Sequence, residues 1–132
     1  MDIQITFSGK KKVTAHAGDQ IILTDQPILS GGENEAPAPF TLFLASIGTC
    51  AGIYVKSFCD QRDIPTDGIT IMQKHSFNPT THLIESIDLI INTPNTFPSK
   101  YKDALIKVAN QCAVKKHLLN PPKIEVSTNT LE

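Results

Sequence analysis

Two long stretches of this chain repeat apolar residues at the spacing of an α-helix, and this pattern restricts the fold most. In the stretch 97–118, the intervals between successive apolar positions are four, three and four, at Tyr101, Leu105, Val108 and Cys112. The stretch 39–62 carries a similar stripe at Phe40, Phe43, Leu44, Ile47, Ala51, Tyr54, Val55 and Phe58. Such a stripe predicts a helix that packs one face on a core. We therefore expect two long central helices.

Shorter segments around these helices alternate apolar and polar residues, as half-buried strands do. They are 3–7, 12–17 and 20–24 before the first helix, 68–75 and 81–92 between the helices, and 124–128 after the second. This order predicts an α+β fold in which two helices cover a mostly antiparallel sheet. A chain of 132 residues has the size of one domain, so we expect a single domain over 1–132.

The composition argues against several classes of partner. The formal net charge is -1, which indicates no surface for nucleic acid or for an anionic membrane. No apolar stretch approaches the length of a membrane span, and the N-terminus is too polar for a secretory signal. Three cysteines in such a chain predict reduced thiols and a cytoplasmic location. The spacing of the cysteines and histidines is not that of a zinc site, so we expect no metal.

Cys50 and Cys112 lie on or beside the apolar stripes of the two predicted helices. Cys50 cannot pair with Cys59 on the same helix, because the rise between them is roughly 13 Å, whereas the Cα atoms of a disulfide lie within about 7 Å. Cys112 is the plausible intramolecular partner. The two thiols could form a redox couple, or both could be inert apolar residues of the core. The sequence next to Cys50 offers neither the positive charge nor the helix N-terminus that activates a thiol.

Four histidines are scattered along the chain, at His16, His75, His82 and His117. A nucleophilic Cys–His pair would need one of them within hydrogen-bond reach of Cys50. Nothing local supports that pair, so a Cys–His acyl-transfer enzyme is only a third hypothesis, and we expect surface or strand histidines.

The run GGENEAPAPFTLFLASIGTC, which ends at Cys50, resembles the cysteine-helix motif of the OsmC/Ohr family, in its short OsmC-like branch. The later run QCAVKK, which contains Cys112, resembles the second cysteine motif of that family. The order of strands and helices is similar as well, so the resemblance covers nearly the whole chain.

This resemblance implies an intertwined homodimer, with two central helices packed back to back and the sheets outside. It implies a thiol-dependent reduction of hydroperoxides, organic ones especially, that uses no metal, flavin or haem cofactor. Cys50 would be the peroxidatic thiolate and Cys112 the resolving thiol, and an external dithiol reductant would reopen their disulfide. An apolar pocket at the dimer interface would favour lipid-like hydroperoxides.

The chain departs from the peroxidases of this family in two respects. Where they carry a glutamate in the first turn of the cysteine helix, this chain has Phe40 and Thr41. Their N-terminal arginine has no counterpart, because Arg62 is the only arginine of the chain.

Other residues near the N-terminus could replace these two groups. The lysines at 10–12 could supply positive charge, although lysine lacks the bidentate fork of arginine. Glu33 or Glu35 could stand in for the carboxylate. The alternative function is that of a non-catalytic protein of the same fold, which binds a small apolar ligand at the dimer interface.

Overall fold

A computed structural model of the chain describes residues 1–131 and forms two compact units, Met1–Ser46 and Ile47–Glu132. We call them the N-terminal unit and the C-terminal unit. The boundary falls within helix α1 (Pro39–Asp60), which therefore belongs to both. The predicted class is confirmed, since the chain combines antiparallel sheets with helices in an α+β fold.

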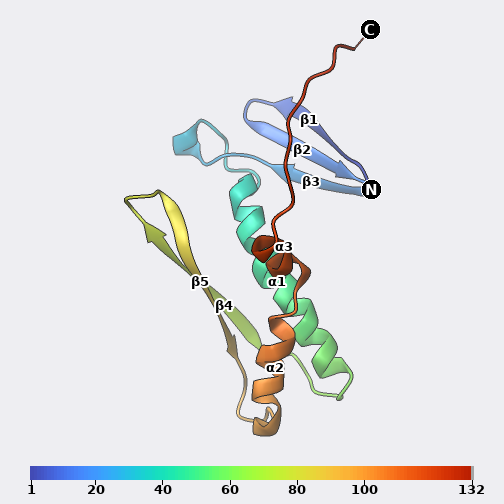
Figure 1. Cartoon of the computed structure of the whole chain (residues 1–132), viewed down its shortest axis with the longest axis vertical. Coiled ribbons are helices and arrows are strands. Elements are labelled where there is room, and N and C mark those ends of the chain that lie inside the picture. The colour runs from blue at the N-terminus through green and yellow to red at the C-terminus, as the bar shows by residue number, and fades with distance from the viewer. Residues whose placement is uncertain (132) are drawn as a thin grey trace. The chain divides into compact units, whose positions relative to one another are not determined.

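The N-terminal unit is built on a three-stranded antiparallel sheet (Figure 1). Its strands are β1 (Ile3–Gly9), β2 (Lys12–Ala17) and β3 (Gln20–Thr24), which lie in this order across the sheet. All three strands were predicted. Gly9 (φ 111°) and Gly18 (φ 59°) lie at the two hairpin turns, where the chain needs a positive φ that glycine adopts without strain.

One face of this three-stranded sheet is apolar and exposed. The strand register places Ile5 opposite Ala15 and Ala15 opposite Ile22, so these residues share that face with Ile3 and Phe7. Ile3 and Ile5 are each 53% exposed, and Phe7 is 86% exposed. The buried residues of this unit are all polar: Thr14, Thr24 and Asp25. In a single chain, the N-terminal unit therefore has no apolar core of its own.

Helix α1 begins at Pro39, as predicted, and ends at Asp60 instead of residue 62. The chain leaves the helix because Asp63 takes a positive φ (52°) and Pro65 follows. The buried residues of the helix keep the spacing of the predicted stripe: Ile47, Ala51, Val55, Phe58 and Cys59.

The C-terminal unit packs α1 on a hairpin of β4 (Thr70–Asn78) and β5 (Leu83–Asn92), which confirms the two strands predicted there. Two glycines of α1 face β4. A Cβ added at Gly52 would lie 3.9 Å from Cδ1 of Ile71, and one added at Gly48 would lie 2.5 Å from Oε1 of Gln73. Gly48 therefore leaves room for the Gln73 side chain, whereas a Cβ at Gly52 would make only an ordinary contact with Ile71. The buried core of the C-terminal unit consists of Val55, Phe58, Cys59, Phe97 and Leu105.

The prediction of a second long helix over 97–118 is wrong, because the chain breaks there into three pieces (Figure 1). They are a 3₁₀ turn (Ser99–Tyr101), helix α2 (Lys102–Ala109) and helix α3 (Ala113–Leu119). The chain tightens at the end of α2, where the N–H of Gln111 donates to the carbonyl of Val108. Cys112 is then extended (φ −63°, ψ 142°) and starts α3. It therefore lies between two helices and not in the middle of one.

The strand predicted at 124–128 does not form within the single chain. Residues 121–131 belong to no helix or strand. Ile124 and Val126 are 84% and 93% exposed. The segment alternates apolar and polar residues as described, but it pairs with no strand of the chain.

Helix α1 also corrects the expectation that no stretch is long enough for a membrane span. It has 22 residues, and an 18-residue window of it has a mean hydropathy of 1.5, so by length and composition it could cross a membrane. The core helix of a soluble protein meets the same conditions, and α1 supplies five buried residues. Length and composition alone are thus weak support for a span.

Candidate functional site

Cys112 is the N-cap residue of α3, and only 1% of it is exposed. Its Sγ accepts a hydrogen bond from the backbone N–H of Lys115 at 3.2 Å. Its carbonyl accepts a second one, from the N–H of Lys116, also at 3.2 Å. The thiol thus satisfies one of the N–H groups that a helix leaves free in its first turn.

Cys50 is half-buried in α1, and its sulfur meets the start of α3. The backbone N–H of Val114 donates to this sulfur, as do the side chain of Cys112 and the N–H of Ala113. These hydrogen bonds, that of Val114 first, lower the pKa of Cys50 below the usual value of a thiol, although burial raises it. The structure therefore brings together the two cysteines that the sequence singled out.

The amides of Ala113 and Val114 are the groups that the sequence reasoning missed. Inside a continuous helix, both would have donated to carbonyls of the preceding turn, whereas at the start of α3 they can face Cys50. One signal was present in the sequence. Asparagine often ends a helix, and Asn110 is the C-cap residue of α2. The helix N-terminus that the residues around Cys50 lack is thus supplied by a distant segment.

Cys59 lies apart from this pair, as its place on the helix predicted. It is fully buried in the core of the C-terminal unit. Burial is the main cause that raises its pKa. Cys59 therefore has the properties of an inert apolar residue.

A cavity of about 740 Å³ lies beside Cys112 in the C-terminal unit. Ile47 of α1, Leu118 of α3 and the β5 residues 84–90 line most of it. Lys115 and Asn110 also line it, and Nζ of the lysine donates to Oδ1 of the asparagine at 2.5 Å. The cavity has the size of a small-molecule site, and its lining suits a mostly apolar ligand.

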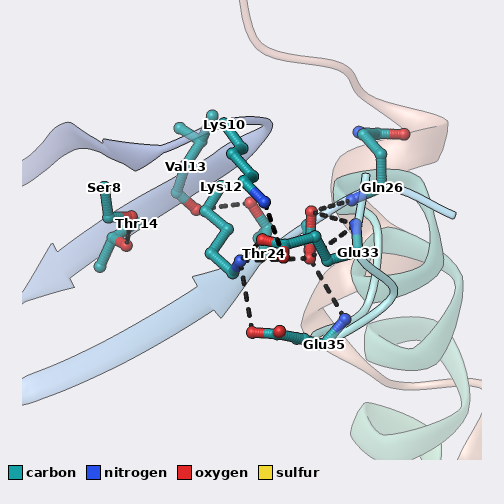
Figure 2. Close-up of polar contacts among 10 residues, drawn as sticks. Ser8, Lys10, Lys12, Val13, Thr14, Thr24, Gln26, Glu33 and Glu35 are labelled. Carbon is teal, nitrogen blue, oxygen red and sulfur yellow. Dashed lines mark hydrogen bonds and ion pairs between the residues drawn. The ribbon is translucent and has the colours of Figure 1, made fainter. Parts of the chain in front are cut away.

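In the N-terminal unit, Lys12 is surrounded by carboxylates of the loop after β3 (Figure 2). Its Nζ forms a short ion pair with Glu33 and lies 3.3 Å from Glu35 and 3.9 Å from Asp25. Lys10 lies 3.1 Å from Glu33. Hydrogen bonding to Lys12 is the main cause that lowers the pKa of Glu33, and the same bond raises the pKa of Lys12. The positive charge of Lys12 is therefore balanced within its own unit.

Asp25 holds the shape of that loop. Its buried carboxylate accepts hydrogen bonds from the backbone N–H groups of Gln26 (2.8 Å), Glu35 (3.2 Å) and Glu33 (3.3 Å). These bonds, that of Gln26 first, lower the pKa of Asp25, although burial raises it. Asp25 and Lys12 together fix the segment that leads into α1.

No histidine among residues 1–131 contributes to the pKa shift of Cys50. Three of the four are hydrogen-bonded to other groups: His16 to Thr6, His75 to Gln73, and His117 to the carbonyl of Ala113. The geometry therefore gives no support to a Cys–His acyl-transfer centre. The same described residues contain no cluster of three or more metal-ligating side chains.

The sequence of residues 32–127 matches the family model described as OsmC-like protein. Solved structures share the fold. A protein of Psychrobacter arcticus 273-4 is 20% identical, with 86% of this chain and 85% of that chain covered and a TM-score of 0.71. The OsmC-like protein of Mycoplasma pneumoniae is 19% identical, with 91% and 87% covered and a TM-score of 0.64.

A third similar structure is the organic hydroperoxide resistance protein OhrB of Bacillus subtilis. It is 17% identical, with 92% of this chain and 93% of that chain covered and a TM-score of 0.56. At such identities, the likeness to these structures shows the fold alone. No curated protein matches the chain.

Proposed function

Because this chain belongs to the family of OsmC-like proteins, we propose that it is a thiol-dependent redox protein that reduces organic hydroperoxides with Cys50 and Cys112. The observation that carries the proposal is the hydrogen bonding of the Cys50 sulfur, to the Cys112 side chain and to the amide of Val114. The first contact prepares a disulfide, and the second stabilises a thiolate. The hydroperoxide resistance named for the B. subtilis protein agrees with such a role.

The reaction would proceed in three balanced steps. The Cys50 thiolate attacks the terminal oxygen of the hydroperoxide, the O–O bond breaks, and Cys50 becomes a sulfenic acid while the leaving alkoxide takes a proton from water and departs as the alcohol. The Cys112 thiol then attacks the Cys50 sulfur, forms the disulfide and releases water. An external dithiol reduces this disulfide and is itself oxidised to a disulfide. Thiols carry all the electrons in this scheme.

The cavity beside Cys112 is the proposed position of the organic part of the substrate. Its lining from Ile47, Leu118 and β5 is mostly apolar, so it would favour an alkyl or lipid-like hydroperoxide over hydrogen peroxide. Lys115 adds a positive charge to the lining. A substrate there would lie next to the resolving thiol.

We also propose that the chain acts as an intertwined homodimer. Two features support this proposal: the uncovered apolar face of the N-terminal sheet, with Phe7 86% exposed, and the unpaired segment 124–128. A second copy of the chain would cover the face and offer a strand edge to the segment. Analytical ultracentrifugation should give the mass of two chains. A monomer at every protein concentration measured would overturn the dimer.

The activity is tested with Cys50→Ser and Cys112→Ser. With cumene hydroperoxide and excess dithiothreitol, wild-type protein should consume the peroxide, and Cys50→Ser should lose the consumption. After peroxide without reductant, the intact mass of wild type should fall by about two hydrogens as two thiols become one disulfide. Cys112→Ser should instead gain an oxygen as sulfenic acid. Equal peroxide consumption by Cys50→Ser and wild type would contradict the proposal.

A second candidate function follows from what the chain lacks. Arg62 is its only arginine and lies on the Phe58 ring, while the first turn of α1 has no acidic residue. A protein without these activating groups could keep the fold and bind a small apolar ligand at the dimer interface, with inert thiols. Native mass spectrometry of the freshly purified protein separates the two functions. A retained ligand together with no peroxide turnover would favour binding.

A further inference from the structure

Arg62 is held in one orientation near the end of α1, without a carboxylate. Its Cζ lies 3.7 Å from the centroid of the Phe58 ring and 5.4 Å from that of Tyr101. Its Nη1 donates to the carbonyl of Phe58 at 3.1 Å. The cation–π contacts with the two rings and the bond to the Phe58 carbonyl hold the guanidinium in place, and its remaining N–H groups keep the fork that matches a carboxylate. Among residues 1–131, Arg62 forms no ion pair within 4 Å.

The same guanidinium borders a groove of about 750 Å³ between α1 and α2 in the C-terminal unit. Its apolar walls include Ile53, Phe58 and Val108. A second cation, Lys107, also lines the groove. In the described part of the chain, Lys107 likewise forms no ion pair. No Asp or Glu lines the groove. This apolar groove therefore carries two positive charges, although the formal net charge of the chain is -1.

We propose that this groove binds a small free carboxylic acid with an aliphatic chain. Arg62 would hold the carboxylate in a bidentate pair, and Lys107 would add a second positive charge. The chain would lie along the apolar wall that contains Ile53, a residue that is 57% exposed without a ligand. The fixed guanidinium lowers the entropy lost on binding, because its orientation is set before the ligand arrives.

The groove is separate from the proposed redox site. Neither Cys50 nor Cys112 lines it. The carboxylic acid would therefore be a second ligand, not the peroxide substrate. Cys50→Ser should bind it as wild type does, and Arg62→Gln should still reduce cumene hydroperoxide, so the two proposals fail independently.

Isothermal titration of the full chain with decanoate tests the proposal, and decanol serves as the uncharged ligand of the same length. Arg62→Gln should weaken decanoate binding about tenfold or more, Lys107→Gln should weaken it less, and neither should change the binding of decanol. Rising salt should weaken decanoate binding alone. Inorganic phosphate, which has no apolar body, should not displace decanoate.

The matched control is Lys56→Gln. Lys56 lies on α1 shortly before Arg62, pairs with Asp60 at 2.6 Å and does not line the groove, so its removal should leave decanoate binding unchanged. Arg62→Lys, which keeps the charge but not the planar fork, should bind decanoate more weakly than wild type if Arg62→Gln does not fold. Absence of decanoate binding would overturn the proposal. This is the result expected if a second copy of the chain covers the groove. Equal binding by wild type and both Arg62 variants would overturn it too.

Discussion

The Sγ of Cys112 accepts the backbone N–H of Lys115 at 3.2 Å, so the proposed resolving thiol is also the N-cap of α3. Helix α3 has seven residues and buries none of them. A helix this short is marginal without support from its ends. The redox role and the structural role of Cys112 therefore have to be separated by the choice of substitution.

Cys112→Ala should loosen α3, whereas Cys112→Ser should not. Alanine removes the cap, which typically costs about 1 kcal/mol, while the serine hydroxyl is a strong N-cap. Hydrogen exchange at the N–H of Lys115 measures the difference locally, and the alanine variant should exchange roughly fivefold faster. Equal exchange in both variants would show that the thiol does not stabilise the helix.

Ala113→Pro should raise the pKa of Cys50 while it preserves α3. Proline fits the first helical position, and the preceding Cys112 already has the extended backbone that proline requires. The substitution removes the N–H of Ala113, which is one of the groups that lower the pKa of Cys50. Alkylation by iodoacetamide at neutral pH, followed by peptide mass spectrometry, should be slower at Cys50 than in wild type. Unchanged alkylation would mean that this amide does not stabilise the thiolate.

Acid should weaken the N-terminal unit through Asp25. Its folded-state pKa is lowered, so its contribution to stability is present above the unfolded-state pKa and is lost as the pH falls through the folded-state pKa. Thermal unfolding followed from neutral pH to about pH 3 should show the melting temperature of wild type falling more steeply than that of Asp25→Asn. The variant should melt lower at neutral pH, since an amide side chain cannot accept every bond that the carboxylate accepts. Parallel curves would exclude this role.

Two glycine-to-alanine substitutions should differ in their effect on the free energy of unfolding. At Gly32, a Cβ would lie 2.1 Å from the backbone oxygen of Gln26, which cannot move without the loop, so we expect a loss of about 1–3 kcal/mol. At Gly48, the nearest atom is the end of the flexible Gln73 side chain, and alanine gains about 1 kcal/mol of helix propensity. Gly48→Ala should therefore be close to neutral. Chemical denaturation of both variants checks the order, and a larger loss at Gly48 would contradict it.

The first helix and the five strands that form could be predicted from the sequence, because their burial patterns depend mainly on local periodicity. Ile47, Ala51 and Val55 keep the spacing of one helix face, and the residues of β1 and β2 alternate between the two faces of a sheet. Cys112, and not Cys59, is among the groups that lower the pKa of Cys50, but a redox couple of Cys50 and Cys112 stays a prediction.

The break before Cys112 could not be found from apolar spacing. One helical stripe fits Tyr101, Leu105, Val108 and Cys112. Cys112 is buried as that stripe predicts, yet its own backbone is extended, so no single helix runs through it. The activating amides of Ala113 and Val114 depend on that break, so they were missed with it. The segment 124–128 shows the opposite error: its alternation was recognised, but alternation alone does not determine which strand edge a segment pairs with, and this segment pairs with none.

The third cysteine gives the protein a built-in probe of its own motions. Cys59 is fully enclosed together with Val55, Phe97 and Leu105, so a thiol reagent can reach it only during moments when that core opens. Its rate of modification therefore measures the frequency of core opening, without any added label. Experiments on Cys50 and Cys112 can include the slowly modified thiol of Cys59 as an internal standard for the integrity of the fold.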